Sequence, residues 1–231
     1  MTRYNNRILG PLPASEINRL APHLMPIRFP LGRPLNNGHP SHCYFLEQGI
    51  ASVVVHHSNG ATVEVGVVGC DGVVGIPILL GTGSAPVNVA VQIAGSGLQM
   101  TASTLKSEFD RPGHFRNRLL NYIHAYFVQI SQTAACNRLH NIEERLARWL
   151  LACRDRMSTD RLALTHEFMA NMLGSPRTTV TLAVGLLEKA GLIKRSRGAV
   201  TILDRPALES AACECYRIVH DEYARLGFFD A

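Results

Sequence analysis

The chain has 231 residues, a formal net charge of +5 and a hydrophobic fraction of 46%. This length can bury a sizeable core, and we expect two domains. No apolar run approaches the ~20 residues that a membrane helix needs, and no apolar segment follows the basic start as it would in a signal peptide. We therefore expect no membrane partner.

The cysteines favour a reduced compartment. Their spacing is neither that of a zinc ribbon nor that of a small secreted scaffold held by disulfides. A cytoplasmic location is the simplest fit. The six are Cys43, Cys70, Cys136, Cys153, Cys213 and Cys215.

The charge is unevenly distributed along the chain. Residues 1–110 contain six basic and six acidic side chains, whereas the remainder contains 17 basic and 12 acidic ones. Within 161–205 there are seven basic residues against three acidic ones. A neutral segment joined to a basic one favours sensing in the first and binding of a polyanion in the second.

The N-terminal half shows many short apolar runs, after a short amphipathic helix expected over Ser15–Leu24. The runs are separated by glycine-containing turns, and Asn59-Gly60 between two alternating runs is a hairpin signal. Many short strands at this spacing indicate an antiparallel β-barrel or jelly roll over residues 1–110. The candidate strands are Cys43–Leu46, Ile50–Val55, Thr62–Val68, Val73–Val74 and Val87–Ile93.

A helical pattern with apolar residues stepping by three and four follows over residues 111–137. This spacing is close to a heptad seam, so we expect a long dimerisation helix. The alternative is that the stripe packs on its own barrel. The expected dimer residues are Leu119, Ile123, Tyr126, Phe127, Ile130 and Ala134. Two further helices are expected over Ile142–Arg156 and Pro206–Leu226.

Two short helices joined by a tight turn are predicted between Leu164 and Gly191. Thr165 is expected to cap the first helix, and Gly174 to end it in a left-handed conformation. Ser175 is then the expected N-cap of the second helix, with Pro176 in its first position. This arrangement is typical of a helix-turn-helix, although an ordinary helical hairpin remains an alternative.

The second helix of such a motif presents its N-terminal end to the DNA major groove. Arg177 can pair with both acceptors of a guanine edge, and threonines suit phosphates or a thymine methyl. Strands at Leu192–Lys194 and Val200–Ile202 would form a basic wing along the phosphates, unless it is only a solvated turn. The expected DNA-binding residues are Thr165, Ser175, Arg177, Thr178, Thr179, Thr181, Lys194, Arg195 and Arg197.

This layout resembles the Crp/Fnr family of bacterial transcription regulators. The likeness spans nearly the whole chain and is strongest in LTHEFMANMLGSPRTTVTLAVGLLEKAGLIKRSRGAVTILDR (Leu164–Arg205), with IEERLARWLL (Ile142–Leu151) and CYFLEQGIASVVV (Cys43–Val55) beside it. It implies an α+β protein with a β-barrel sensor over 1–110, a dimerisation helix over 111–137 and a winged helix-turn-helix over 138–231. The implied partners are pseudo-palindromic double-stranded DNA, a second copy of the chain and RNA polymerase.

The family's phosphate-binding cassette is degenerate in this chain. Members that bind cyclic nucleotides carry G-E-L … R-[ST]-A, in which the glutamate holds the ribose and the arginine neutralises the phosphate. The corresponding residues here are Gly75, Ile76 and Pro77, then Pro86 and Val87. A buried phosphate without a cation or donor loses most of its binding energy, so the effector is expected to differ from cyclic AMP or to be absent.

The reading helix also departs from the family's best-known member, which has a glutamate and a second arginine where this chain has Thr178 and Leu182. We therefore expect a different half-site with fewer direct base contacts. The clustered N-terminal cysteines of the iron–sulfur branch are absent as well, and Cys43 and Cys70 are expected to be buried or bystander thiols.

The barrel histidines offer an alternative chemistry. His39, His42, His56 and His57 with Glu47 could bind a metal or haem, as in a sensor or a cupin-like enzyme, but they lack the cupin His-x-His pair. Cys213-x-Cys215 with His220 is a second candidate, but residues i and i+2 of a helix point apart, so helix packing is expected instead. A protein-interaction module is a third alternative. We therefore expect no enzyme activity, no metal site and no cofactor.

Overall fold

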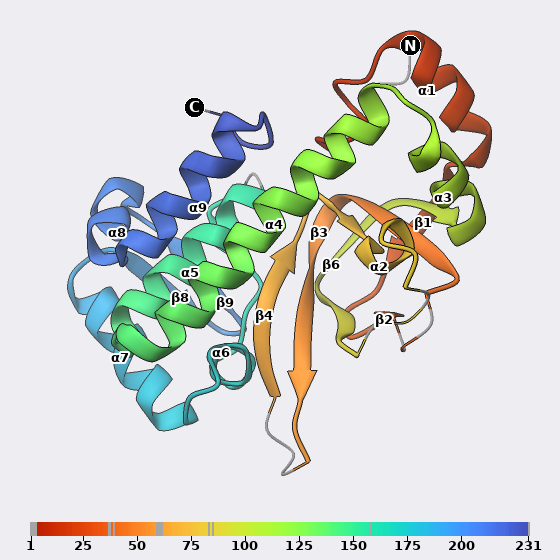
Figure 1. Ribbon diagram of the computed structural model, residues 1–231. Coiled ribbons are helices and arrows are strands. Elements are labelled where there is room, and N and C mark those ends of the chain that lie inside the picture. Colours follow the sequence, from red (N-terminus) through yellow and green to blue (C-terminus); the bar gives the residue numbers. More distant parts are fainter. Residues whose placement is uncertain are drawn as a thin grey trace.

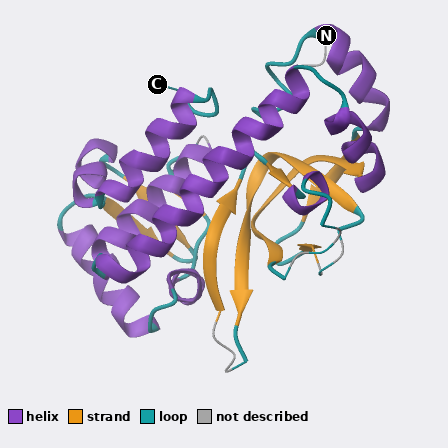
Figure 2. Cartoon of the chain, in the orientation of Figure 1, coloured by secondary structure: helices purple, strands orange, loops and turns teal. Residues whose placement is uncertain are grey.

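A computed structural model describes residues 4–36, 38, 40–58, 62–82, 84, 86–157 and 159–230. It is an α+β protein in which a sheet and a group of helices are joined by one long helix, α4, that crosses the molecule between them (Figures 1 and 2). None of its described helices combines the length and hydropathy needed to cross a membrane. In chain order the elements are α1 (Ala14–Leu20), η1 (Ala21–His23), β1 (Met25–Phe29), β2 (Pro34–Asn36), β3 (His42–His56), β4 (Thr62–Val68), β5 (Val73–Val74), α2 (Ile76–Leu79), β6 (Asn88–Thr101), α3 (Ala102–Asp110), α4 (His114–Leu139), α5 (Ile142–Met157), β7 (Arg161–Leu162), α6 (His166–Leu173), α7 (Arg177–Lys189), β8 (Ile193–Ser196), β9 (Ala199–Ile202), α8 (Arg205–Ala211) and α9 (Glu214–Arg225).

The N-terminal strands form one antiparallel sheet, which confirms the predicted class of this half. Its strands pair in the order β1-β6-β3-β4, with β2 on β6 and β5 on β3. The pairing of His56 with Thr62 places β3 and β4 in a hairpin. The predicted Asn59-Gly60 turn itself lies outside the described residues.

Strand β3 continues through a position where a turn was predicted. Gln48-Gly49 was expected to separate two strands, but β3 continues through both residues. Gly49 has φ +90°, and the register against β6 shifts between Gln48 and Ile50. A Cβ on Gly49 would lie 2.6 Å from the carbonyl oxygen of Ile93. The glycine therefore accommodates a bulge that bends the strand, where the sequence pattern indicated a chain reversal.

The long helix α4 has two apolar faces. Leu119, Tyr122 and Tyr126 are buried against the sheet, whereas Phe127 is 68% exposed. Leu119 and Tyr126 were predicted at the dimer interface, and they are instead core residues of the protomer because their face of the helix packs on the sheet. The outward stripe steps by three and four, as a coiled-coil seam does, and consists of Leu120, Ile123, Phe127, Ile130 and Ala134.

The C-terminal half contains the two predicted helices α6 and α7 and a three-stranded sheet of order β7-β9-β8, in which β7 precedes α6 and the other two strands follow α7. The last predicted helix is divided into α8 and α9, because the backbone becomes extended at Ala212 and Cys213. Asp204 caps α8 by accepting a hydrogen bond from the backbone N–H of Ala207 at 2.9 Å. Helix α3 lies in a segment for which no element was predicted.

Buried polar contacts join the two halves. Arg156 of α5 forms an ion pair with Asp71 of the β4–β5 turn at 3.0 Å, and both side chains are inaccessible to solvent. Glu64 of β4 accepts a hydrogen bond from the indole N–H of Trp149 in α5 at 2.7 Å. Apolar residues of β3, β4 and β6 also share a core with α5, α6 and α7. Of the helices α6 and α7, α6 contacts β4 directly, whereas α7 packs on α5 and α6.

The carboxyl group of Glu64 is set in a chain of buried groups. Burial raises its pKa from 4.5 to about 7, although bonds from Ser52 and Trp149 oppose that rise. The Ser52 hydroxyl lies 2.6 Å from Glu64 and 2.5 Å from the amide oxygen of Gln92. A hydroxyl has one proton to donate, so a neutral Glu64 that donates to Ser52 while Ser52 donates to Gln92 satisfies both contacts.

Replacement of Glu64 by glutamine should change how stability depends on pH. The folded protein holds the proton of Glu64 up to about pH 7, whereas the unfolded chain releases it near 4.5. The free energy of unfolding of the wild type should therefore contain a contribution that falls as pH rises between these values, by up to about 3 kcal/mol. Glutamine keeps an acceptor for Trp149 and does not titrate. In urea unfolding at pH 4 and pH 8, Glu64→Gln should gain stability relative to the wild type at the higher pH; an unchanged difference would contradict the assignment.

Candidate nucleic-acid interface and effector cavity

Helices α6 and α7 meet in a turn with helix-turn-helix geometry. The hydroxyl oxygen of Thr165 accepts a bond from the N–H of Phe168 at 3.2 Å, as predicted for an N-cap. Gly174 ends α6 with φ +57°. The second predicted cap is wrong: Pro176 occupies the N-cap of α7, which begins at Arg177, and the Ser175 hydroxyl donates back to the carbonyl of Leu173 at 3.3 Å.

The turn is held against neighbouring elements. Met169, Val180 and Val184 are fully buried between α6, α7 and α5. The guanidinium of Arg145 on α5 donates to the carbonyl oxygen of Leu173, which satisfies one of the free acceptors at the end of α6. The exposed face of α7 is therefore presented on a fixed support.

The outward face of α7 carries a cation at each end, Arg177 and Lys189, with hydroxyls and apolar groups between them. Arg177 and Thr178 are exposed, and Thr179 and Thr181 are half-buried. The Thr181 hydroxyl lies 3.2 Å from Nδ1 of His166 on α6, a contact that the sequence analysis missed. Leu182 is 70% and Leu186 54% exposed. Two leucines that are left uncovered on a basic surface are unusual for a face that meets only water.

The predicted wing is present as β8, β9 and the turn between them. Lys194, Arg195 and Arg197 are all exposed. Arg195 is paired with Glu188 of α7 at 2.6 Å, so part of its charge is already neutralised. No ion pair involves Arg177, Lys194 or Arg197 within the part of the chain that the structure describes.

Cations of α7 and of the wing both act on His166, a residue of α6. The pKa of His166 is lowered first by burial and then by the charges of Arg195 and Arg177. Arg177 and Arg195 are therefore both close enough to His166 to act on it, and the positive end of the α7 helix dipole adds to the charge of Arg177. Such an arrangement favours a polyanion.

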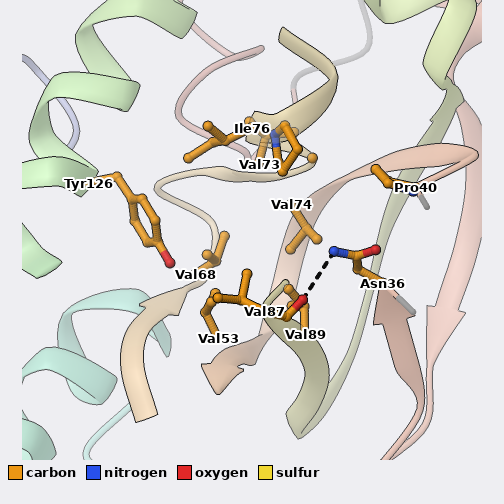
Figure 3. Close-up of a pocket in the computed structure, with 12 residues that line it drawn as sticks. Asn36, Pro40, Val53, Val68, Val73, Val74, Ile76, Val87, Val89 and Tyr126 are labelled. Carbon is orange, nitrogen blue, oxygen red and sulfur yellow. Dashed lines mark hydrogen bonds between the residues drawn. The ribbon is translucent and has the colours of Figure 1, made fainter. Parts of the chain in front are cut away.

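A cavity of about 180 Å³ lies inside the sheet domain (Figure 3). Half of its lining residues are valines, and the two polar side chains among them belong to Asn36 and Tyr126. Asn36 donates to the carbonyl oxygen of Val87 at 3.4 Å. The Tyr126 hydroxyl is buried and has no hydrogen-bond partner among the described residues. Tyr126 comes from α4, so the long helix forms part of the cavity wall.

The predicted cassette residues meet at this cavity. Gly75, Ile76, Pro77 and Val87 line it, whereas Pro86 is exposed and is not among its lining residues. No lysine or arginine belongs to the wall that the structure describes. A cyclic phosphate would meet apolar side chains there, which agrees with the expected loss of the phosphate-binding cassette.

The barrel histidines do not form a metal centre among the described residues. His42 contacts the Ser41 hydroxyl at 3.0 Å, and His56 contacts the Thr62 hydroxyl at 2.8 Å. His39 lies outside the described residues. Glu47 accepts bonds from the backbone N–H groups of Asn5 and Asn6. Cys43 and Cys70 are buried as predicted, and burial raises the thiol pKa values to about 12 and about 11.

Two glycine-to-alanine substitutions, one in the turn after α6 and one within α7, should change the free energy of unfolding in opposite directions. Gly174→Ala forces a side chain into φ +57°, and its Cβ would lie 3.0 Å from Val63, so we expect a loss of about 1–2 kcal/mol in unfolding free energy. Gly185→Ala, in the middle of α7, has open space for its Cβ and should gain about 0.5–1 kcal/mol. Thermal or urea unfolding checks both; equal effects of the same sign would contradict the turn geometry.

Residues 144–211 match the Crp-like helix-turn-helix domain. Several solved structures share the fold of the whole chain. A putative transcriptional regulator of the Crp/Fnr family from Eubacterium rectale is 20% identical, with a TM-score of 0.65 over 87% of this chain and 94% of that one. No curated protein matches the chain.

Two further structures extend this likeness. FixK2 from Bradyrhizobium japonicum is 14% identical, with a TM-score of 0.69 over 82% of this chain and 98% of that one. The c-di-GMP responsive global regulator CLP of Xanthomonas campestris is 16% identical, with a TM-score of 0.66 over 83% of this chain and all of the other. The chain thus has the fold of the Crp/Fnr transcription regulators and carries their helix-turn-helix domain.

Proposed function

We propose that this protein is a homodimeric, sequence-specific DNA-binding transcription regulator. The observation that carries the proposal is the exposed N-terminal end of α7, where Arg177 has no ion-pair partner among the described residues, together with a wing that carries Lys194 and Arg197. In this arrangement α7 enters the major groove and the wing follows the phosphate backbone. Residues 1–110 would sense, 111–137 would dimerise and 138–231 would bind DNA.

The proposed dimer forms along the outward stripe of α4. Leu120 and Phe127 are 44% and 68% exposed, and they lie one heptad apart on a helix of 26 residues. A helix of this length is ~39 Å long at ~1.5 Å per residue, so two copies can pair over several turns. Two DNA-binding domains related by a two-fold axis would bind a pseudo-palindromic site. As a transcription regulator in the cytoplasm, the dimer would act with RNA polymerase.

We propose that the effector, where one binds, is a compact and mostly apolar molecule with one hydrogen-bonding group. The cavity offers it the unpaired hydroxyl of Tyr126 and the amide of Asn36. Contact with Tyr126 would act directly on α4 and therefore on the dimer seam. Cyclic AMP is not expected to bind in the family's usual manner, and a micromolar affinity in calorimetry would contradict this.

Substitution of Arg177 tests the reading helix. Loss of a bidentate contact to guanine should weaken specific binding by ~1–3 kcal/mol in Arg177→Ala and relax the preference at one base of each half-site. Selection of binding sites from random DNA, followed by affinity measurements at fixed salt, gives both quantities. Arg197→Ala is the matched control: as a phosphate contact it should lower affinity for every sequence and reduce the salt slope by ~1. An unchanged footprint and affinity for Arg177→Ala would mean that α7 does not read the bases.

Substitution of Phe127 tests the dimer seam. Burial of a phenylalanine side chain contributes about 1.5–3 kcal/mol, and a two-fold interface buries two copies. Phe127→Ser should therefore raise the dimer dissociation constant by about 100-fold or more in analytical ultracentrifugation. Leu31→Ser, at a residue 68% exposed in the β1–β2 connection, is the control and should leave the association unchanged. Dimerisation that is equally strong in Phe127→Ser would place the interface elsewhere.

A further inference from the structure

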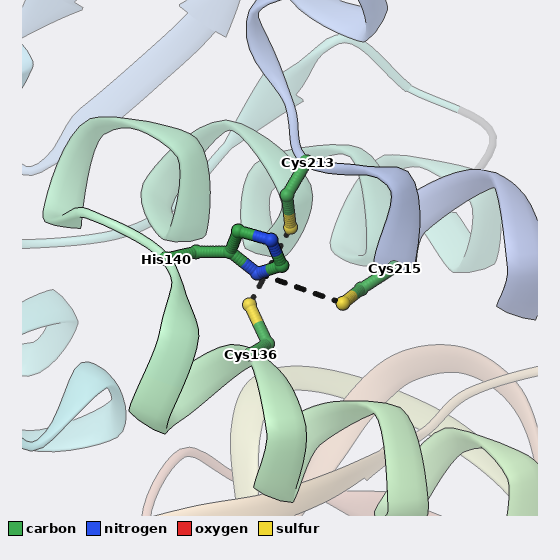
Figure 4. Close-up of side chains that lie close together, drawn as sticks. All are labelled: Cys136, His140, Cys213 and Cys215. Carbon is green, nitrogen blue, oxygen red and sulfur yellow. Dashed lines mark hydrogen bonds between the residues drawn. The ribbon is translucent and has the colours of Figure 1, made fainter.

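Four metal-binding side chains meet where α4 ends and α9 begins (Figure 4). Cys136 lies in the last turn of α4, and His140 is the residue that caps this helix. Cys213 caps the start of α9, and Cys215 lies in its first turn. The thiol and imidazole ligand atoms are all within 4.8 Å of one another. They form the only group of three or more such ligands among the described residues.

Two of the distances within this group match the edges of a tetrahedral metal site. The sulfur atoms of Cys136 and Cys213 are 3.5 Å apart, and Nδ1 of His140 lies 3.7 Å from the sulfur of Cys215. A tetrahedral zinc ion, with Zn–S of about 2.3 Å and Zn–N of about 2.0–2.1 Å, requires edges of about 3.5–3.8 Å between its ligands. Three cysteines and one histidine are also a common ligand set for a structural zinc.

The histidine is already oriented for coordination. Its Nε2 lies 3.2 Å from a carboxylate oxygen of Glu214, the residue between the two cysteines of α9. A proton on Nε2 that is shared with this carboxylate leaves the lone pair of Nδ1 free, and Nδ1 is the atom that faces the sulfurs. Carboxylates hold metal-bound histidines in this way in many zinc proteins.

A buried arginine next to the four ligands can balance the net charge of a metal site. Three thiolates and a divalent ion leave one net negative charge, and the guanidinium of Arg148 is buried beside them. The Nε atom of Arg148 has no hydrogen-bond partner among the described residues. A metal-bound thiolate is an acceptor for such a donor.

We propose that Cys136, His140, Cys213 and Cys215 bind one zinc ion. The three sulfurs form a cluster separate from both hydrophobic cores, so they are not needed to fill either one. The prediction that Cys213 and Cys215 point apart on a helix with His220 fails, because Cys213 precedes α9 in extended conformation. The ring of His220 instead packs on Tyr216 and Phe229.

The site would clamp two segments that are far apart in the sequence. Cys136 and Cys213 are 77 residues apart, and the α6–α7 reader lies between them in the chain. A metal ion would fix the end of the seam helix to the C-terminal helices that pack on α5. If the protein is the proposed regulator, occupancy of this site would set the angle between the dimer seam and the reading helices.

Metal binding can be measured on the full-length reduced protein without DNA. After treatment with a chelator and a phosphine reductant, titration with Co²⁺ should give one equivalent per chain with the visible bands of a tetrahedral ion and sulfur-to-metal charge transfer. Zn²⁺ should then displace the cobalt stoichiometrically and raise the melting temperature. Absence of the tetrahedral spectrum would overturn the proposal. It would also be overturned if the cysteines formed a Cys136–Cys213 disulfide and bound no metal after reduction.

Single substitutions assign the ligands. Loss of a residue that hydrogen-bonds to a metal ligand typically lowers metal affinity about 10- to 100-fold, so Glu214→Gln should lower the zinc affinity by a factor in that range. Cys136→Ser or Cys215→Ser should lower it by at least about 100-fold and weaken the charge-transfer band. Cys70→Ser is the control: its hydroxyl can keep the bond to the carbonyl of Arg156, and the cobalt spectrum should not change. Equal spectra for Cys70→Ser and Cys136→Ser would overturn the assignment.

Binding of DNA by the zinc-loaded and the chelated protein is a separate measurement. A metal-dependent change in operator affinity that is lost in Cys136→Ser would support the regulatory consequence. A metal site with no DNA binding in either form would leave the zinc assignment intact and contradict the proposed function.

Discussion

The buried ion pair between Arg156 and Asp71 joins the two halves of this protein. Removal of one partner from such a pair leaves a charge without compensation and typically costs about 3–5 kcal/mol, far more than an exposed pair contributes. The guanidinium also lies 5.2 Å from the rings of both Tyr223 and Phe229. One cation therefore holds together α5, the β4–β5 turn and the C-terminal segment, and the reader cannot separate from the sheet without exposing it.

This connection determines how a signal could cross the molecule. Tyr126 lines the cavity on one face of α4, while the other face of the same helix carries the proposed dimer seam. On the inner face, Gln129 pairs with the backbone of Val67 in β4 and donates to the Tyr223 hydroxyl at 2.9 Å. A displacement of α4 by an effector would thus act on β4 and α9 together. Coupling of this kind needs a packed element with two arrangements. Helix α4 is a candidate, because it lines the cavity, carries the proposed seam and packs on α9.

The parts that were predictable from sequence depend on local signals. Thr165 and Gly174 fix the ends of α6 through contacts within a few residues, so the helix-turn-helix was predicted with its correct turn glycine. The two faces of α4 were not separated, because a spacing of three and four marks apolar positions without saying which face meets the sheet. Leu119 and Tyr126 were assigned to the wrong face for this reason.

The cysteine cluster was missed for a different reason. Its members come from segments 77 residues apart, and no local pattern brings Cys136 and His140 to Cys213. The break between α8 and α9 has no strong local signal either: Asp204 and Pro206 mark the start of α8, but the extended residues Ala212 and Cys213 include no glycine or proline. A single helix over 206–226 would have pointed Cys213 and Cys215 in different directions, as the sequence analysis assumed.

The composition of the reading face limits how this protein would recognise DNA. Arg177 is the one charged group at the N-terminal end of α7, and Thr181 is partly engaged with His166. The exposed Leu182 and Leu186 can offer only apolar contact, and the apolar group on the major-groove edge is the thymine methyl. With so few direct hydrogen bonds, much of the discrimination would depend on thymine positions and on the shape and bendability of the site. In the proposed dimer, recognition of this kind would require the two α7 helices to be held at a defined separation, which would depend on the proposed seam of α4 and on the junction between α4 and α9.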